Sequence, residues 1–319
     1  MKAFVGYILD FHKGYFSFKL YLSLALFVAL LIAFNYTVDL EDSYIDAYAG
    51  KPVRALWFFL LHGCAYFGAL AIIQWQGKVK SNLTREFWIL SLIGFAVLSI
   101  DRSLTFHTYY VWNNAPTEIR LMLFKSVSNF FTFFSLLIPL YLLKRFTDER
   151  KEIGFYGLTL KNIKFKPYWT MLAIMVPLVV AASFTEGFQS YYPTYKRAGG
   201  ESFANYFQLP EFFSAIFFEL FYLSGFVYVE LFFRGFLVIG FVRILGKNAV
   251  IPMAITYATY HFGKPIGETI SSVFGGYLLG IIALYSKNIW GGVFVHMGIA
   301  FLMELFAFLA MAGFIGVMF

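Results

Sequence analysis

Long apolar stretches separated by short polar segments run along most of the chain. A helix that crosses a membrane needs about 20 mostly apolar residues, and about nine stretches approach or reach that length. They lie at 19–38, 54–75, 87–106, 121–143, 168–186, 212–242, 249–263, 268–286 and 289–315. This pattern predicts an all-α fold, a polytopic membrane protein with about eight or nine transmembrane helices.

The segments between these stretches are too short to form a separate soluble domain. The longest connections are 144–167 and 187–211. The stretch 249–263 is shorter than the others and has Pro252 near its start, which is typical of a tilted or partly re-entrant helix.

Composition supports a membrane environment and excludes other classes of protein. Apolar residues make up 60% of the chain and charged residues 13%, whereas an average soluble domain is about one quarter charged. This excludes a disordered chain, a nucleic-acid binder and an ordinary soluble enzyme. The lipid bilayer is the expected partner of the 42 Phe and 22 Tyr side chains. The single cysteine, Cys64, excludes an internal disulfide and a cysteine-based metal cage.

The distribution of Lys and Arg predicts the orientation in the membrane. If the N-terminus is inside, the inner segments 78–85, 144–151 and 161–166 carry many of the basic residues, and the outer segment 39–46 is acidic. Lys and Arg concentrate in cytoplasmic loops, and the net charge of +7 fits loops near anionic lipid. We expect a plasma (inner) membrane protein of a prokaryote, with its N-terminus inside.

Ionisable residues inside the predicted spans are candidates for function, because each costs about 2.5–3.5 kcal/mol at mid-bilayer. They are His62, Asp101, Arg102, Lys125, Glu219, Glu230, Arg234, His261, Glu268, His296 and Glu304. His62 lies beside Gly63, which indicates a role in helix packing. The residues Asp101, Arg102 and Lys125 lie where long side chains can reach the interface. From Glu219 onward nearly every helix carries an ionisable residue.

Glu230 and Arg234 lie four residues apart in the apolar run VYVELFFRGFLV, so they share one helix face. The pair either neutralises itself and fixes the rotation of the helix, or contributes to a site. Gly235, the next residue, allows another backbone to approach closely.

Two histidines lie on later helices. His261 follows Tyr257 by one turn, and His296 follows two glycines in NIWGGVFVHMGIAF. A single intramembrane histidine is usually packed or hydrogen-bonded, but two of them with an acidic pair are harder to explain by packing alone. Glu230, His261 and His296 can converge to hold a water molecule or a divalent metal such as zinc.

These motifs resemble those of the CPBP family (CAAX proteases and bacteriocin-processing enzymes, or Abi family), which are intramembrane proteases. VELFFRGFL at 229–237 resembles EExxxR, Tyr257 to His261 resembles FxxxH, and His296 to Ala300 resembles HxxxN or HxxxD. IGFYGLTLKNIKF at 153–165 resembles the segment before the family's core helices. The resemblance divides the chain into N-terminal helices of unknown role, 1–149, and a CPBP-like core, 150–319.

We expect the catalytic set to be Glu230, Arg234, His261 and His296, although Glu230 and Arg234 match the second Glu and the Arg of the first motif, which look more structural in the family. In the family, the first Glu of EExxxR activates water with help from the second-motif His, and the third motif stabilises the oxyanion. This sequence has Val229 in place of that Glu and Ala300 in place of the Asn. A lost oxyanion donor costs about 10²–10³ in rate, and a lost base about 10²–10⁴.

Three interpretations follow from the motifs and their departures. The first is an endopeptidase in which another carboxylate replaces the missing base, with Glu230 ranked first and Glu304 second. The second is a catalytically silent relative that binds a membrane protein or a peptide in the same pocket. The third is a transporter with a proton relay, against which the absence of inverted repeats counts.

Overall fold

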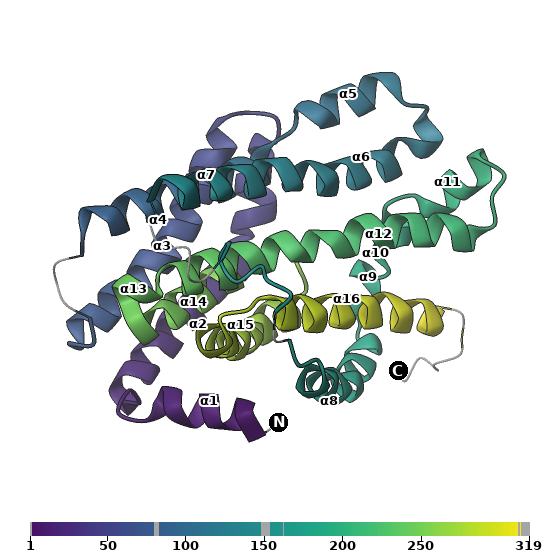
Figure 1. Cartoon of the computed structure of the whole chain (residues 1–319). Helices are drawn as coiled ribbons and strands as arrows, with labels where there is room; N and C mark the ends of the chain where they lie inside the picture. The colour runs from purple at the N-terminus through teal and green to yellow at the C-terminus, as the bar shows by residue number, and fades with distance from the viewer. Residues whose placement is uncertain (1, 80–82, 148–153, 162, 312, 314–319) are drawn as a thin grey trace. The chain divides into compact units, whose positions relative to one another are not determined.

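The computed structural model describes residues 2–79, 83–147, 154–161, 163–311 and 313. Helices make up 83% of the described residues, which contain no strand (Figure 1). The prediction of an all-α fold is confirmed. The predicted boundary at residues 149 and 150, and part of the basic segment 144–151, lie outside the described residues.

Eight helical segments among the described residues are long and apolar enough to cross a membrane. They are Phe18–Val38, Val53–Trp75, Arg85–Asn114, Thr117–Arg145, Lys166–Ser183, Glu211–Thr259, Ile266–Ser286 and Trp290–Met311. The predicted stretches 212–242 and 249–263 fall within one of these segments, Glu211–Thr259. The protein is therefore an integral membrane protein, as the hydropathy pattern predicts.

The chain folds into two compact units, each built from three separate segments. Unit 1 comprises Met1–Leu104, Ser135–Lys161 and Glu230–Trp290, and unit 2 comprises Thr105–Phe134, Asn162–Val229 and Gly291–Phe319. Both units take residues from either side of the predicted division into 1–149 and 150–319. That division stays a prediction about function.

Unit 1 is centred on a short buried helix. Its elements are α1 (Lys2–His12), α2 (Phe18–Val38), η1 (Leu40–Ile45), η2 (Asp46–Tyr48), α3 (Val53–Trp75), α4 (Arg85–Ser103), α7 (Ile138–Thr147), η5 (Leu231–Gly240), α13 (Val242–Leu245), η6 (Gly246–Ala249), α14 (Val250–Thr259) and α15 (Ile266–Ser286). All ten residues of α14 are buried, and the helix packs against α15 and α3. This central helix leads directly into the turn that carries His261.

Two glycines allow α15 to approach α14 closely. A β-carbon added at Gly276 would lie 3.0 Å from Cδ1 of Tyr257 and 3.4 Å from Cα of Ala254. At Gly280, one turn later, it would lie 2.6 Å from Cε of Met253. Small residues at such positions let helices in membranes pack backbone against backbone.

The segment η5, which follows Glu230 directly, is a π-helix, and Leu231 to Ile239 are all buried. A π-helix bonds each residue to the fifth one along and winds less per residue than an α-helix. The stretch 212–242, predicted as one helix, therefore changes its winding after Glu230. A β-carbon on Gly235 would lie 2.8 Å from the carbonyl oxygen of Tyr156, so the predicted close backbone approach at Gly235 is confirmed.

Unit 2 contains α5 (Phe106–Asn114), α6 (Thr117–Thr132), α8 (Lys166–Ser183), α9 (Glu186–Tyr191), α10 (Thr194–Arg197), α11 (Gly200–Tyr206), and most of α12 (Glu211–Glu230) and α16 (Trp290–Met311). The predicted long connection 187–211 folds into three short helices, α9 to α11. Tyr195 of α10 is buried in a core with Met122 of α6 and Phe218 of α12. This connection is therefore packed into unit 2.

Candidate functional site

Glu230 and Arg234 form an ion pair in the interior of unit 1. Glu230 is the last residue of α12, and Arg234 lies in the π-helix η5. Nη1 of Arg234 lies 3.0 Å from Oε1 of Glu230, and the two side chains are 1% and 0% exposed. The guanidinium carbon of Arg234 also lies 4.1 Å from the ring centroid of Tyr257. Arg234 thus contacts both Glu230, the acid of the first motif, and Tyr257, the aromatic residue of the second motif.

Tyr257 in turn orients His261. The two rings are 4.4 Å apart and nearly perpendicular. Nδ1 of His261 lies 2.9 Å from the carbonyl oxygen of Tyr257. Because a carbonyl oxygen only accepts hydrogen bonds, Nδ1 is assigned the proton, and Nε2 of the neutral ring becomes an acceptor.

A second carboxylate, that of Glu268, lies beside His261. Oε1 of Glu268, in the first turn of α15, is 4.0 Å from Nε2 of His261, and the two side chains are 15% and 6% exposed. Nζ of Lys264 lies 2.5 Å from the same oxygen. The sequence singled out Glu268 only as an ionisable residue. Pro265 is the sequence signal for this contact, because proline favours the start of a helix. A helix that starts after Pro265 brings Glu268, in its first turn, near His261.

The turn that carries His261 is held by α2 and α15. The hydroxyl of Tyr36 on α2 donates to the carbonyl of Lys264 at 2.6 Å. The hydroxyl of Thr269 on α15 donates to the carbonyl of His261 at 2.8 Å. Gly263 has a φ of +81°, and a β-carbon there would collide with the Glu41 carboxylate. Helices from residues 1–149 therefore help to fix the position of the histidine.

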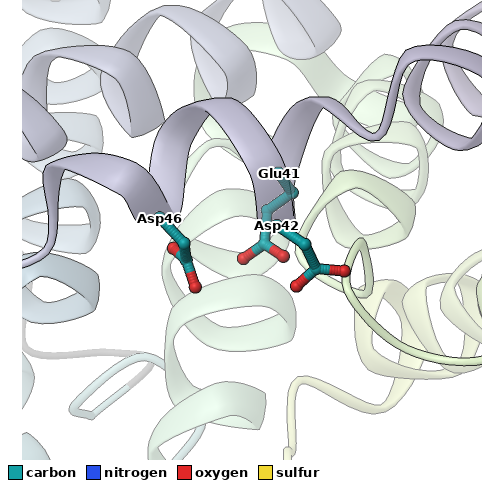
Figure 2. A group of neighbouring side chains, drawn as sticks. All are labelled: Glu41, Asp42 and Asp46. Atoms are coloured by element: carbon teal, nitrogen blue, oxygen red, sulfur yellow. The ribbon is translucent and has the colours of Figure 1, made fainter.

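Three acidic residues next to this turn resemble a cation site, but two of them are paired with arginines. Carboxylate oxygens of Glu41, Asp42 and Asp46 lie within 4.8 Å of one another (Figure 2). Arg102 donates to Glu41 at 2.9 Å and Arg54 to Asp46 at 2.6 Å. We therefore interpret the group as an ion-pair cluster that supports the His261 turn.

Arg102 also contacts two aromatic rings. Its guanidinium pairs with Glu41, which lies beyond the end of α2, and it lies over the rings of Phe58 and Tyr260, 4.8 and 4.7 Å from their centroids. That Arg102 reaches the membrane interface stays a prediction. Burial raises the pKa of Glu41 from its ordinary 4.5 to about 7, although the positive charge of Arg102 opposes this shift.

Other ionisable residues of the spans have structural contacts. His62 is fully buried, and its Nδ1 lies 2.9 Å from Oγ1 of Thr259, which fits the predicted packing role. Asp101 accepts a hydrogen bond from Ser135. Nζ of Lys125 lies 5.8 Å from the ring centroid of Phe124.

His296 lies in unit 2, on α16, where its ring is 4.2 Å from that of Phe226 on α12. Ala300, one turn further along α16, is buried. Because Glu230 and His261 belong to unit 1, the convergence of all three residues stays a prediction.

Glu304, ranked second as a replacement base, instead anchors the short helices of unit 2. Its Oε1 accepts hydrogen bonds from the backbone nitrogen and the hydroxyl of Thr194 at 2.8 and 2.6 Å. Its Oε2 accepts one from the backbone nitrogen of Tyr195 at 3.3 Å. These bonds use both carboxylate oxygens of Glu304 and indicate a structural role, and its role as a replacement base stays a prediction.

A zinc ion does not fit the donors of unit 1 alone. Catalytic zinc has three protein ligands and one open position. Of the predicted ligands Glu230, His261 and His296, unit 1 contains two, and the carboxylate of Glu230 is already paired with Arg234. The divalent metal stays a prediction, which metal analysis of the purified protein would test.

Comparison with known families supports the motif assignment. Residues 210–302 match the family model described as Rce1-like, type II CAAX prenyl endopeptidase Rce1-like. No curated protein and no solved structure matches the chain. The match includes Glu230, Arg234, Tyr257, His261, Glu268 and His296. Residues 210–302 of the chain are therefore similar to the Rce1-like family, and this match bears out the resemblance to the CPBP family.

Proposed function

We propose that the chain is an intramembrane endopeptidase of the CPBP type, which hydrolyses a peptide bond in a membrane-associated substrate. One observation carries the proposal: Glu230, Arg234, Tyr257 and His261 form a continuous buried chain of contacts. These residues lie within the segment that matches the Rce1-like model. Since that model describes a prenyl endopeptidase, a prenylated C-terminal peptide is the first substrate class to test.

In the proposed hydrolysis, each residue of the site has a separate role. Nε2 of His261 accepts a hydrogen bond from the attacking water and orients it, because Nδ1 donates to the carbonyl of Tyr257. Glu230 and Arg234 position the ring of Tyr257, against which His261 packs. His296 polarises the scissile carbonyl, the role that its motif has in the family.

The departures from the family motifs favour a second candidate function. Val229 cannot accept a proton, and the methyl group of Ala300 cannot donate a hydrogen bond to an oxyanion. A protein that lacks both groups can bind a membrane protein or a peptide tail in the same pocket without cleaving it.

Cleavage by the purified protein separates the two functions. The protein in detergent is incubated with a prenylated C-terminal peptide and with a library of membrane-anchored peptides, beside His261→Ala and His296→Ala. We expect the wild type to cleave and both variants to lose cleavage. His12→Ala is the matched control, because His12 lies on α1, outside the matched segment. Binding without cleavage would support the second function, and cleavage that survives both substitutions would contradict the proposed site.

A variant that is expected to gain activity tests the same pocket. Val229→Glu combined with Ala300→Asn restores the groups that the family motifs contain. If the two losses limit the reaction, the double variant cleaves faster than the wild type. An unchanged rate would show that neither position limits hydrolysis.

A further inference from the structure

We infer that Glu268 supplies the carboxylate that holds the attacking water, in place of the glutamate that is missing at Val229. The inference rests on the proposed peptidase function and names an additional residue of that site. Glu268 belongs to the first turn of α15, and its Oε1 lies 4.0 Å from Nε2 of His261. Neither the first nor the second motif includes this residue.

The geometry between the two side chains suits a water molecule. The bond from Nδ1 of His261 to the carbonyl of Tyr257 leaves Nε2 as an acceptor, and an ionised carboxylate also only accepts. A separation of 4.0 Å is too long for a direct hydrogen bond, and groups this far apart are commonly bridged by water. One water that donates a hydrogen to each side chain keeps the lone pairs of its oxygen available for attack.

The surroundings of Glu268 suit a negatively charged side chain. Nζ of Lys264 lies 2.5 Å from its Oε1, and the first turn of a helix stabilises negative charge. Glu268 and His261 are 15% and 6% exposed, so neither side chain is completely enclosed. By contrast, the side chain of Glu230 is 0% exposed and lies against Arg234, which leaves it less open to an attacking water.

The step balances with water as the only co-reactant. The water oxygen forms a bond to the scissile carbonyl carbon while one O–H bond breaks and its proton passes to the Glu268 carboxylate. The second hydrogen of the water stays hydrogen-bonded to Nε2 of His261. When the C–N bond breaks, Glu268 returns the proton to the leaving nitrogen. The products are a new carboxyl terminus and a new amine.

Kinetics of Glu268 variants test this role. Glu268→Gln keeps the size of the side chain but removes its basicity, so we expect kcat to fall by about 10²–10⁴ while KM stays within a few-fold of wild type. Added formate or acetate should restore part of the activity of Glu268→Ala, because a small carboxylate can occupy the vacated space, and should not restore His261→Ala. A purely structural role would give no such rescue.

The control is Glu118→Gln, which alters an exposed glutamate in the first turn of another helix, α6; its kcat should not change. Thermal unfolding of each variant in detergent shows whether the fold is intact. If His261 is needed for cleavage but Glu268→Gln retains the wild-type kcat, the assignment of Glu268 falls and the peptidase function stands. A low kcat without rescue by formate or acetate also overturns the assignment. If the wild type cleaves nothing, both proposals fall.

Discussion

Arg234 is the residue on which the contacts of the site depend. It neutralises Glu230 and lies over the ring of Tyr257, and it is 1% exposed. Removing one member of a buried ion pair leaves the other charge uncompensated, which costs about 3–5 kcal/mol. Removing both charges together is often nearly neutral for stability. Comparing the stability of single and double variants of Glu230 and Arg234 therefore tests whether the ion pair stabilises the fold.

We predict that Arg234→Met lowers the thermal unfolding temperature markedly and that Glu230→Gln combined with Arg234→Met recovers much of the loss. The single variant leaves a buried carboxylate without a cation, whereas the double variant leaves neither charge. Thermal unfolding of the purified proteins in detergent measures both effects. Equal unfolding temperatures for the single and double variants would show that the two charges are not coupled.

Glu41 predicts a dependence of stability on pH. Its pKa is raised from 4.5 to about 7, so the folded protein binds this proton more tightly than the unfolded chain does. Its contribution to stability is therefore greatest below about pH 4.5 and is lost as the pH rises through about 7. Over this window, the unfolding temperature of the wild type should fall more steeply than that of Glu41→Gln. Identical slopes would contradict the raised pKa.

At the scale of single residues, the sequence predicts pairs within one helix better than contacts between helices. The spacing of Glu230 and Arg234 predicts their ion pair, which forms at 3.0 Å. The contact between Glu268 and His261 depends on the conformation of the turn 260–265. The spacing of apolar residues does not predict the conformation of such a turn. The ion pair of Arg102 with Glu41 joins two helical segments, and the sequence does not predict it.

At the scale of elements, close packing of α14 and α15 places Tyr257 against Arg234. Gly276 faces Tyr257 and Ala254, whereas nothing lies within 4 Å of a β-carbon added at its neighbour Gly275. These adjacent glycines on one helix provide a matched pair of sites, one packed and one open.

We predict that Gly276→Leu impairs both stability and peptidase activity, while Gly275→Leu is tolerated. A leucine at 276 has to displace the ring of Tyr257, since its β-carbon alone would lie 3.0 Å from Cδ1. Overpacking of this kind costs about 1–3 kcal/mol or more. Unfolding temperature and the rate of peptide cleavage are measured for both variants. Equal behaviour of the two would show that the α14–α15 contact does not position the site.

Hydropathy predicted the helices, but it could not predict their internal winding. The segment 212–242 was expected as one regular helix, and it changes from α to π after Glu230. Runs of Phe, Leu and Gly are equally apolar in either form, so composition contains no signal for the change. The short helices α9 to α11 were also missed, because they are too short to show a period and depend on the side chain of Glu304.

At the scale of the whole molecule, the distribution of Lys and Arg predicts the topology, with the N-terminus inside. The test starts from a variant in which Cys64 is replaced, so that one new cysteine can be labelled alone. Lys51→Cys places this cysteine between the first and second spans, and Lys78→Cys places it between the second and third. We expect an impermeant thiol reagent to label Lys51→Cys in intact prokaryotic cells, and Lys78→Cys only after the membrane is opened. The reverse pattern would place the N-terminus outside.

We propose that this membrane protein uses water to cleave a peptide bond and that the reaction needs His261. Digestion of a prenylated or membrane-anchored peptide in water enriched with ¹⁸O, followed by mass spectrometry of the products, tests the claim directly. The account predicts one ¹⁸O atom in the new carboxyl terminus made by the wild type, and no such product with His261→Ala. Absence of the product with the wild type, or its undiminished formation by His261→Ala, would contradict the account.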